Sequence, residues 1–168
     1  MKKVVTIMLL LTVCFSLCSC DPGSFYIDRD ELNTIVSIEL IEYANPNQKE
    51  FSSWVPNHFE KLVPFVPDNA TVLECLPSEN IPDFLDTFAK TDILHTYYAY
   101  NSPKDVCIRL NYQNGNFLII WANYSDNSYA GYIGEYSSDG TVLSFWGSFS
   151  SLSYYKELVQ QYFDYNLE

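Results

Sequence analysis

The sequence predicts an α+β domain, with a twisted, mostly antiparallel sheet of about five to six strands and two helices packed on one of its faces. Three observations predict this class. The segment 106–124 alternates apolar and polar residues on either side of an Asn-Gly pair, which is typical of a β-hairpin. A second hairpin signal, Asp139-Gly140, follows it. Apolar residues recur at helical spacing in two further segments, at 80–90 and after Ser151.

The first hairpin is predicted to close through a two-residue type I′ turn at Asn114-Gly115, because both positions of that turn require positive φ. This turn fixes which residues share a face. One face is wholly apolar and is expected to be buried; it carries Val106, Ile108, Leu110, Tyr112, Phe117, Ile119 and Trp121. The opposite face is mixed and carries Cys107, Arg109, Asn111, Leu118, Ile120 and Ala122.

The Asp139-Gly140 pair predicts a second two-residue turn. The strand partners are then Tyr136 with Leu143, Gly134 with Phe145, and Tyr132 with Gly147. A glycine in a strand leaves a gap that an aromatic ring on the neighbouring strand can cover, so the glycine–aromatic pairs favour this hairpin.

The first part of the chain holds three further elements. Alternation predicts a strand at 34–43, with Val36, Ile38 and Leu40 on one side. Prolines at 56, 64 and 67 allow at most a short helix around 58–63. A short strand is expected at 71–76.

Three elements complete the predicted order. Asn80 is placed to cap a helix over 80–90, with Asp83 three residues later. Residues 95–100 have the composition of a strand. Ser151 or Ser153 is expected to cap a last helix, in which Tyr155, Leu158, Val159 and Tyr162 share one face.

Residues 1–20 have a basic start at Lys2 and Lys3, an apolar run, and the end Leu17-Cys18-Ser19-Cys20. This pattern is typical of a secretion signal. Its last four residues resemble the lipobox of bacterial lipoproteins. The resemblance covers the leader only, and it implies cleavage before Cys20 and attachment of diacylglyceryl and palmitate-type acyl chains to Cys20. Two or three acyl chains are enough for stable anchoring. The alternative is an ordinary secreted protein cleaved near Ser19.

The chain therefore divides into a signal peptide at 1–19, a lipidated cysteine and short tether at 20–32, and one globular domain at 33–168. The expected location is the cell membrane, lipid-anchored on the extracytoplasmic face. Asp21 resembles an inner-membrane retention signal in envelopes with two membranes and has no such meaning with one membrane. The sequence leaves the number of membranes open.

Charge argues against nucleic acid as a partner. The chain has nine Lys and Arg against 21 Asp and Glu, a net charge of −12, and removal of the leader lysines makes it about −14. Such a surface repels phosphate backbones at long range. Aromatic residues make up 17% of the chain, with 14 tyrosines. Tyrosine favours both strands and half-apolar recognition surfaces.

No motif in the chain identifies a reaction. His58 and His95 lie far apart and lack neighbours at metal-ligand spacing, so neither a metal nor a cofactor is expected. The run Gly147-Ser148-Phe149-Ser150-Ser151 lacks the second glycine of a nucleophile elbow. Glutamates on predicted strands are the remaining catalytic possibility: Glu39, Glu74 and Glu135. No catalytic residue can be chosen among them.

Cys75 and Cys107 are the cysteines of the predicted domain. Outside the cytoplasm they could form a disulfide that joins the second strand to the first hairpin. The alternative is two small buried thiols.

The favoured function is a non-catalytic binding module whose partner is an envelope protein or a cell-wall polysaccharide. Arg109, Asn111 and Trp146 are expected on the outer face of the sheet, with Tyr132 as a further contact residue, because aromatic rings offer large contact areas with few rotatable bonds. The first alternative is an envelope hydrolase that uses a carboxylate or serine. The second is a protective or inhibitory lipoprotein that occupies a site on another protein.

Overall fold

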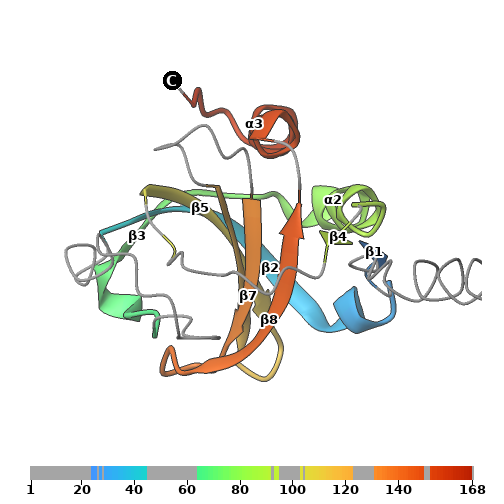
Figure 1. The fold of residues 1–168 in the computed structure, drawn as a ribbon. Coiled ribbons are helices and arrows are strands. Elements are labelled where there is room, and N and C mark those ends of the chain that lie inside the picture. The colour runs from blue at the N-terminus through green and yellow to red at the C-terminus, as the bar shows by residue number, and fades with distance from the viewer. Residues whose placement is uncertain are drawn as a thin grey trace, which may run out of the picture.

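The computed structural model describes residues 24–25, 27, 29–44, 64–91, 93–94, 103, 105–122, 131–149 and 152–167. These residues form one antiparallel sheet of eight strands with two α-helices on one face, which confirms the predicted α+β class (Figure 1). The strand order is β1-β4-β8-β7-β6-β5-β2-β3. Six strands have six or more residues, and β1 and β4 have two residues each.

Apart from β1 and β4, which were not predicted, the elements follow the predicted order. The strands are β1 (Ser24–Phe25), β2 (Ile35–Tyr43), β3 (Ala70–Cys75), β4 (Ile93–Leu94), β5 (Asp105–Tyr112), β6 (Phe117–Ala122), β7 (Gly131–Tyr136) and β8 (Val142–Phe149). The helices are α2 (Ile81–Phe88) and α3 (Leu152–Tyr162). Three short 3-10 turns accompany them: η1 (Glu31–Thr34), η2 (Pro67–Asn69) and η3 (Ser78–Asn80).

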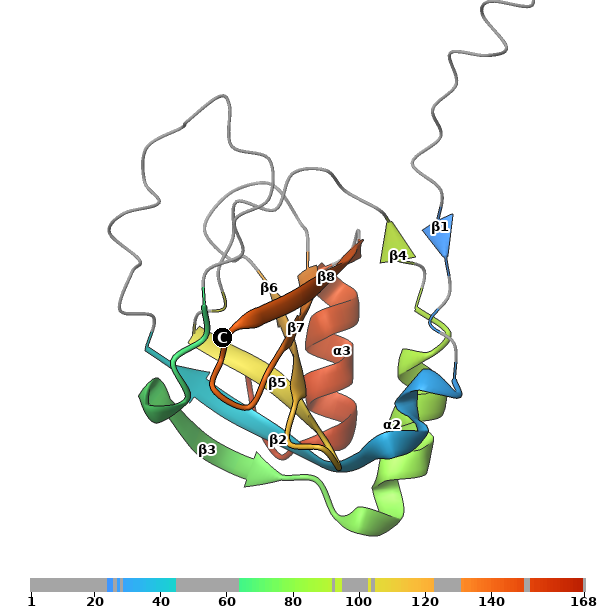
Figure 2. The same ribbon diagram turned by 90° about the horizontal axis from the view of Figure 1, so that it is seen from below.

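The larger core lies between the sheet and the two helices, on what we call the helix face (Figure 2). α2 contributes Phe84, Leu85 and Phe88, which share one side of the helix. Tyr155 of α3 is fully buried, and its hydroxyl donates a hydrogen bond of 2.7 Å to the Val106 carbonyl of β5. This bond joins α3 to β5 of the sheet, next to the buried Tyr155 ring.

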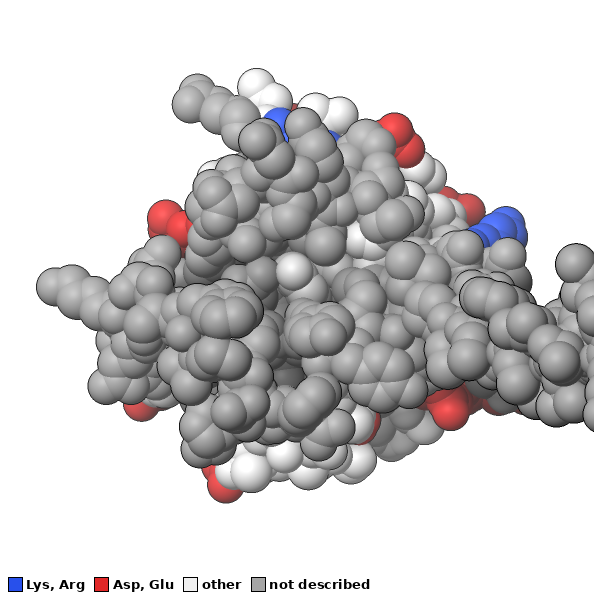
Figure 3. All heavy atoms as spheres, in the orientation of Figure 1, with Lys and Arg blue, Asp and Glu red and all other residues white. Residues whose placement is uncertain are grey.

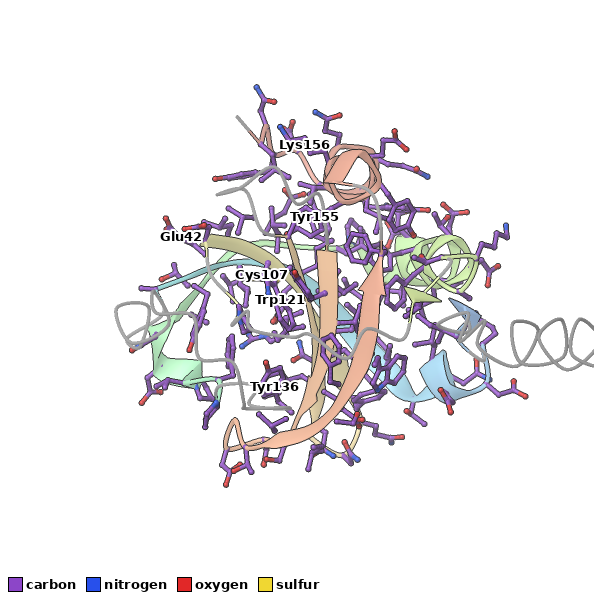
Figure 4. The ribbon with its side chains drawn as sticks, viewed as in Figure 1. Glu42, Cys107, Trp121, Tyr136, Tyr155 and Lys156 are labelled. Atoms are coloured by element: carbon purple, nitrogen blue, oxygen red, sulfur yellow. The ribbon has the colours of Figure 1, made fainter. Side chains whose placement is uncertain are left out.

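A second core covers the opposite face, which we call the aromatic face. It consists of Ile41, Tyr43, Phe65, Cys107, Phe117, Ile119, Trp121, Tyr132 and Tyr136. Cys107, Trp121 and Tyr136 lie within the curve of the sheet, while Tyr155 projects from α3 on the other side (Figure 4). Every residue of β6 is therefore buried, because both faces of this strand are covered.

The register of the first hairpin differs from the predicted one by one residue. Leu110 pairs with Leu118. Backbone N–H groups donate from Tyr112 to Asn116 at 2.9 Å and from Gly115 to Tyr112 at 3.0 Å, so the loop has three residues and not two. Only Gly115 has positive φ, at 88°. Asn114 instead accepts a bond of 2.9 Å from the Asn116 N–H through its side chain, as asparagine does in turns.

A slip of one residue exchanges the two faces of a strand. Leu118 and Ile120, predicted on the mixed face, are fully buried on the helix face. Phe117, Ile119 and Trp121 lie instead on the aromatic face. The prediction was correct for β5 and wrong for β6.

The second hairpin closes with the same kind of loop. The Ser137 N–H donates to Thr141 at 2.9 Å, the Gly140 N–H donates to Ser137 at 2.8 Å, and Gly140 has φ of 84°. Gly134 faces Phe145 as predicted. The other predicted pairs are wrong, because the register shifts twice: Tyr136 pairs with Val142, and Gly147 pairs with Ile133.

The remaining strand and helix predictions are largely confirmed. The predicted 34–43 strand is β2, but Val36 is 56% exposed because the register against β5 shifts between Ile35 and Ser37. The predicted 80–90 helix is α2, and Asn80 occupies its N-cap position without a side-chain capping bond. The predicted helix at 58–63 and the strand at 95–100 lie outside the described residues.

The predicted tether belongs in part to the fold. β1 pairs with β4, and Ile27 and Leu32 are buried in the helix-face core. The tether prediction is therefore wrong for these residues. Their apolar side chains belong to this core, although charged residues flank them in the sequence.

Candidate binding site

An open hollow of about 380 Å³ lies beside the tip of the first hairpin. We call it the carboxylate hollow, and it is lined by Glu31, Thr34, Tyr112, Asn114, Glu135 and Trp146. Its volume lies in the range of small-molecule sites, which begins at roughly 300 Å³.

Three parts of the fold bring these residues together. η1 lies against the hairpin because the Gln113 N–H donates to the Thr34 carbonyl at 2.8 Å. Glu135 comes from the neighbouring strand β7. Trp146 is the extra residue where the β7–β8 register shifts, since Ile133 pairs with Gly147 and Gly134 pairs with Phe145. A bulge of this kind redirects a side chain, and it places the indole at the hollow.

The Glu135 carboxylate is held in position by two donors. Its Oε2 accepts a hydrogen bond of 2.8 Å from the Ser144 hydroxyl and one of 3.3 Å from the Trp146 indole N–H. Within the described ranges the ion pairs are Arg29 with Asp86 and Arg109 with Glu39. Neither carboxylate of the hollow, Glu31 or Glu135, therefore has a cationic partner in this part of the chain.

Tyr112 forms a buried wall of the hollow. The residue is 9% exposed, and its hydroxyl makes no hydrogen bond to any residue that the structure describes. Burial and the nearby charges of Glu135 and Glu31 raise the pKa of this phenol well above 10. The hydroxyl thus stays neutral and is free to bond to a ligand.

Arg109 and Asn111, two of the predicted binding residues, belong to a polar network at the aromatic face. Arg109 forms an ion pair with Glu39, with an Nε–Oε2 distance of 2.7 Å. The Asn111 amide donates to the same Glu39 oxygen at 3.0 Å and to the Ser37 hydroxyl at 2.9 Å. Both charged side chains are 17% exposed. This network joins β2 to β5.

Tyr132 and Trp146, the other two predicted binding residues, lie on opposite faces. Tyr132 is 8% exposed and stacks on Trp121 of the aromatic face, with ring centroids 5.6 Å apart. Trp146 packs against the helix-face core and lines the hollow. The structure brings Arg109 and Asn111 together, but it places Trp146 away from them.

Among the described residues, the buried side-chain polar atoms without hydrogen-bond partners are the Trp121 Nε1 and the Tyr136 hydroxyl, and both belong to the aromatic face. Burial raises the pKa of the Tyr136 phenol, so this group stays neutral. An unsatisfied buried polar group costs about 1–3 kcal/mol, and this part of the core is correspondingly weakened.

Cys75 and Cys107 do not form the predicted disulfide. β2 lies between their strands: Cys75 is opposite Glu39, and Cys107 is opposite Ile41. Strands separated by one other strand lie roughly 9–10 Å apart, beyond the reach of a disulfide. Cys107 is buried as the alternative expected, whereas Cys75 is exposed.

The sequence did not indicate Glu31, Thr34 or Asn114 as binding residues, and Glu135 was predicted only as one of several strand glutamates. His58 and His95 lie outside the described residues. Among the residues that are described, no group of three His, Cys, Asp or Glu could hold a metal ion. The helices of this same portion include none long and apolar enough to cross a membrane.

Comparison with protein-family models, with curated protein sequences and with solved structures finds no match for the chain. The function of the protein is therefore inferred from the site itself.

Proposed function

We propose that the protein is a membrane-anchored, extracytoplasmic lipoprotein that acts as a non-catalytic binding module for a cell-wall polysaccharide or an envelope protein. The carboxylate hollow carries the binding part of this proposal. It is open, and it combines an aromatic wall with polar groups that are available to a ligand. The resemblance of Leu17-Cys18-Ser19-Cys20 to a lipobox supports the anchor.

The polar groups of the hollow suit recognition. Glu135 is fixed by Ser144 and Trp146, so it does not have to be ordered when a ligand arrives. The Trp146 side chain offers a large contact area and has few rotatable bonds. A site that is already ordered binds with a smaller loss of conformational entropy.

A second candidate function is a hydrolase. Glu31 and Glu135 line the same hollow, and glycosidases use two carboxylates in one cleft. Release of soluble fragments from cell-wall polymer by the unaltered protein, lost in Glu135→Gln, would support this candidate over the binding module.

The binding function is tested with the full chain in a non-ionic detergent. We expect saturable co-sedimentation with purified cell-wall polymer, or stoichiometric capture of one envelope protein, and Trp146→Ala is expected to weaken the interaction at least tenfold. Trp146→Phe retains most of the apolar packing and controls for lost stability. Val72→Ala, on the exposed edge strand β3, is the matched surface control.

If polymer or envelope protein binds Trp146→Ala as strongly as the original protein, the hollow is not the binding site. Capture of a protein without any polymer binding would favour the inhibitory alternative. Absence of both interactions would contradict the binding module.

The anchor is tested by Cys20→Ala in cells labelled with a fatty acid. We expect an unprocessed precursor without acyl label, because the modified thiol precedes cleavage in the lipoproteins that this leader resembles. A cleaved and labelled product would disprove the assignment of Cys20.

A further inference from the structure

We propose that the carboxylate hollow binds a protonated amine. This inference rests on the proposed binding function and adds the chemical class of the ligand. Three features of the hollow argue for it: the charge of its lining, the number of its carboxylates, and the hydroxyl of Tyr112.

The charge of the lining is negative and uncompensated. Among the described residues that line it, Glu31 and Glu135 are the only ionisable ones apart from Tyr112, and neither has a basic partner in the described parts of the chain. The whole chain has a net charge of −12, and acidic side chains lie at several places around the face drawn in Figure 3. A cation is therefore drawn toward the hollow, and an anion is repelled from it.

The number of carboxylates favours an organic cation over a metal ion. Calcium takes six to eight oxygen ligands in proteins, and magnesium demands an octahedral set. The hollow offers two carboxylates, and the described residues contain no acidic group of three. The Trp146 and Tyr112 rings make part of its lining apolar. Aromatic surfaces favour an ammonium group on a carbon chain, because they contact the chain and attract the charge.

The Tyr112 hydroxyl is the independent observation. Tyr112 is more than nine-tenths buried, it lines the hollow, and its hydroxyl has no partner in the described structure. Glu31 and Glu135 line the same hollow as this hydroxyl. An ammonium group has three N–H donors, so it can bond to the hydroxyl oxygen and to a carboxylate together. A neutral phenol beside two carboxylates thus forms an acceptor set for one ammonium group.

The test uses n-butylammonium as the probe and butan-1-ol as its neutral analogue, with the full chain in non-ionic detergent at constant ionic strength. We expect butylammonium to change the tryptophan emission saturably, and butanol at the same concentrations to leave it unchanged. Trp146→Phe should lose the change. Equal responses to the two probes would overturn the inference, because the charge would then contribute nothing.

Three variants assign the recognition to the lining. Glu135→Gln removes the charge but keeps an oxygen that can accept from Ser144 and Trp146, and it should weaken butylammonium binding at least tenfold. Glu31→Gln should act in the same direction, and Tyr112→Phe should weaken binding several-fold. Glu157→Gln, on the exposed side of α3, is the matched control and should bind normally. Unchanged affinity in Glu135→Gln would also overturn the inference.

Competition separates this inference from the proposed function. If butylammonium displaces bound polymer, the amine that the hollow recognises belongs to the polymer. If butylammonium binds without displacing polymer, the natural ligand is a small free amine. If Trp146-dependent polymer binding occurs and butylammonium does not bind, the amine inference fails and the binding module stands. If neither polymer, envelope protein nor amine binds, both fail.

Discussion

Gly140→Ala is expected to lower the free energy of unfolding by about 3 kcal/mol or more. Gly140 has φ of 84°, a conformation that costs roughly 1–2 kcal/mol for a residue with a Cβ. An added Cβ would also lie 1.7 Å from the Phe65 carbonyl oxygen. Phe65 must then move, and its 2.9 Å hydrogen bond to the Gly140 carbonyl is lost at a further cost of about 1–3 kcal/mol.

Gly115→Ala is the matched control. Gly115 occupies the same position of the same kind of loop with φ of 88°, but an added Cβ there meets only the Ser138 Cβ at 3.6 Å. Gly115→Ala is expected to lower the free energy of unfolding only by the cost of a Cβ at positive φ, roughly 1–2 kcal/mol. Urea unfolding followed by circular dichroism measures both. Equal losses in the two variants would show that the contact with Phe65 has no energetic role.

Both hairpins show what a local sequence signal can and cannot predict. Asn114-Gly115 and Asp139-Gly140 each mark the place where the chain reverses. The length of the turn was predicted wrongly in both, because the Asn or Asp side chain accepts a backbone N–H two residues later. That bond stabilises a three-residue loop, in which the glycine alone needs positive φ. A difference of one loop residue reversed the predicted faces of β6.

β6 explains why alternation did not reveal this error. All its residues are apolar enough to be buried on either face, so no polar residue marks the wrong register. The sequence could predict that the strand is central. It could not predict that Trp121 belongs to the aromatic face and Ile120 to the helix face.

Local sequence patterns could not predict the carboxylate hollow, for a different reason. Its lining comes from positions between 31 and 146, and it depends on a bulge at Trp146 and on the packing of η1. Trp146 was singled out for its exposed aromatic character, while Glu31 was assigned to a tether. Register shifts depend on the neighbouring strands, and a single sequence does not specify them.

Arg109 illustrates how a polar residue on a strand can be structural. Sequence reasoning predicted it as a binding residue on an outer face. The structure pairs it with Glu39, one strand away, and Glu39 also holds Asn111. We therefore expect Arg109→Met to reduce stability and to leave the interactions of the carboxylate hollow unchanged.

Arg109→Met and Glu39→Met are each expected to cost about 2–3 kcal/mol, because each leaves the partner's charge at 17% exposure without compensation. The double variant should lie within about 1 kcal/mol of the original protein, since well-packed apolar side chains can replace a buried ion pair. Arg29→Met is the matched control: its pair with Asp86 has a similar distance, 2.8 Å, but is 34% and 62% exposed, so its loss should cost less than about 1 kcal/mol.

Urea unfolding of the four proteins gives the coupling energy directly. A double variant as unstable as the sum of the singles would contradict this account, because the two charges would then act independently. If Arg109→Met loses butylammonium or polymer binding at a temperature where the variant is folded, Arg109 takes part in binding, as the sequence predicted. Retained binding with lowered stability is the expected result, because the pair connects β2 to β5 on the face away from the hollow.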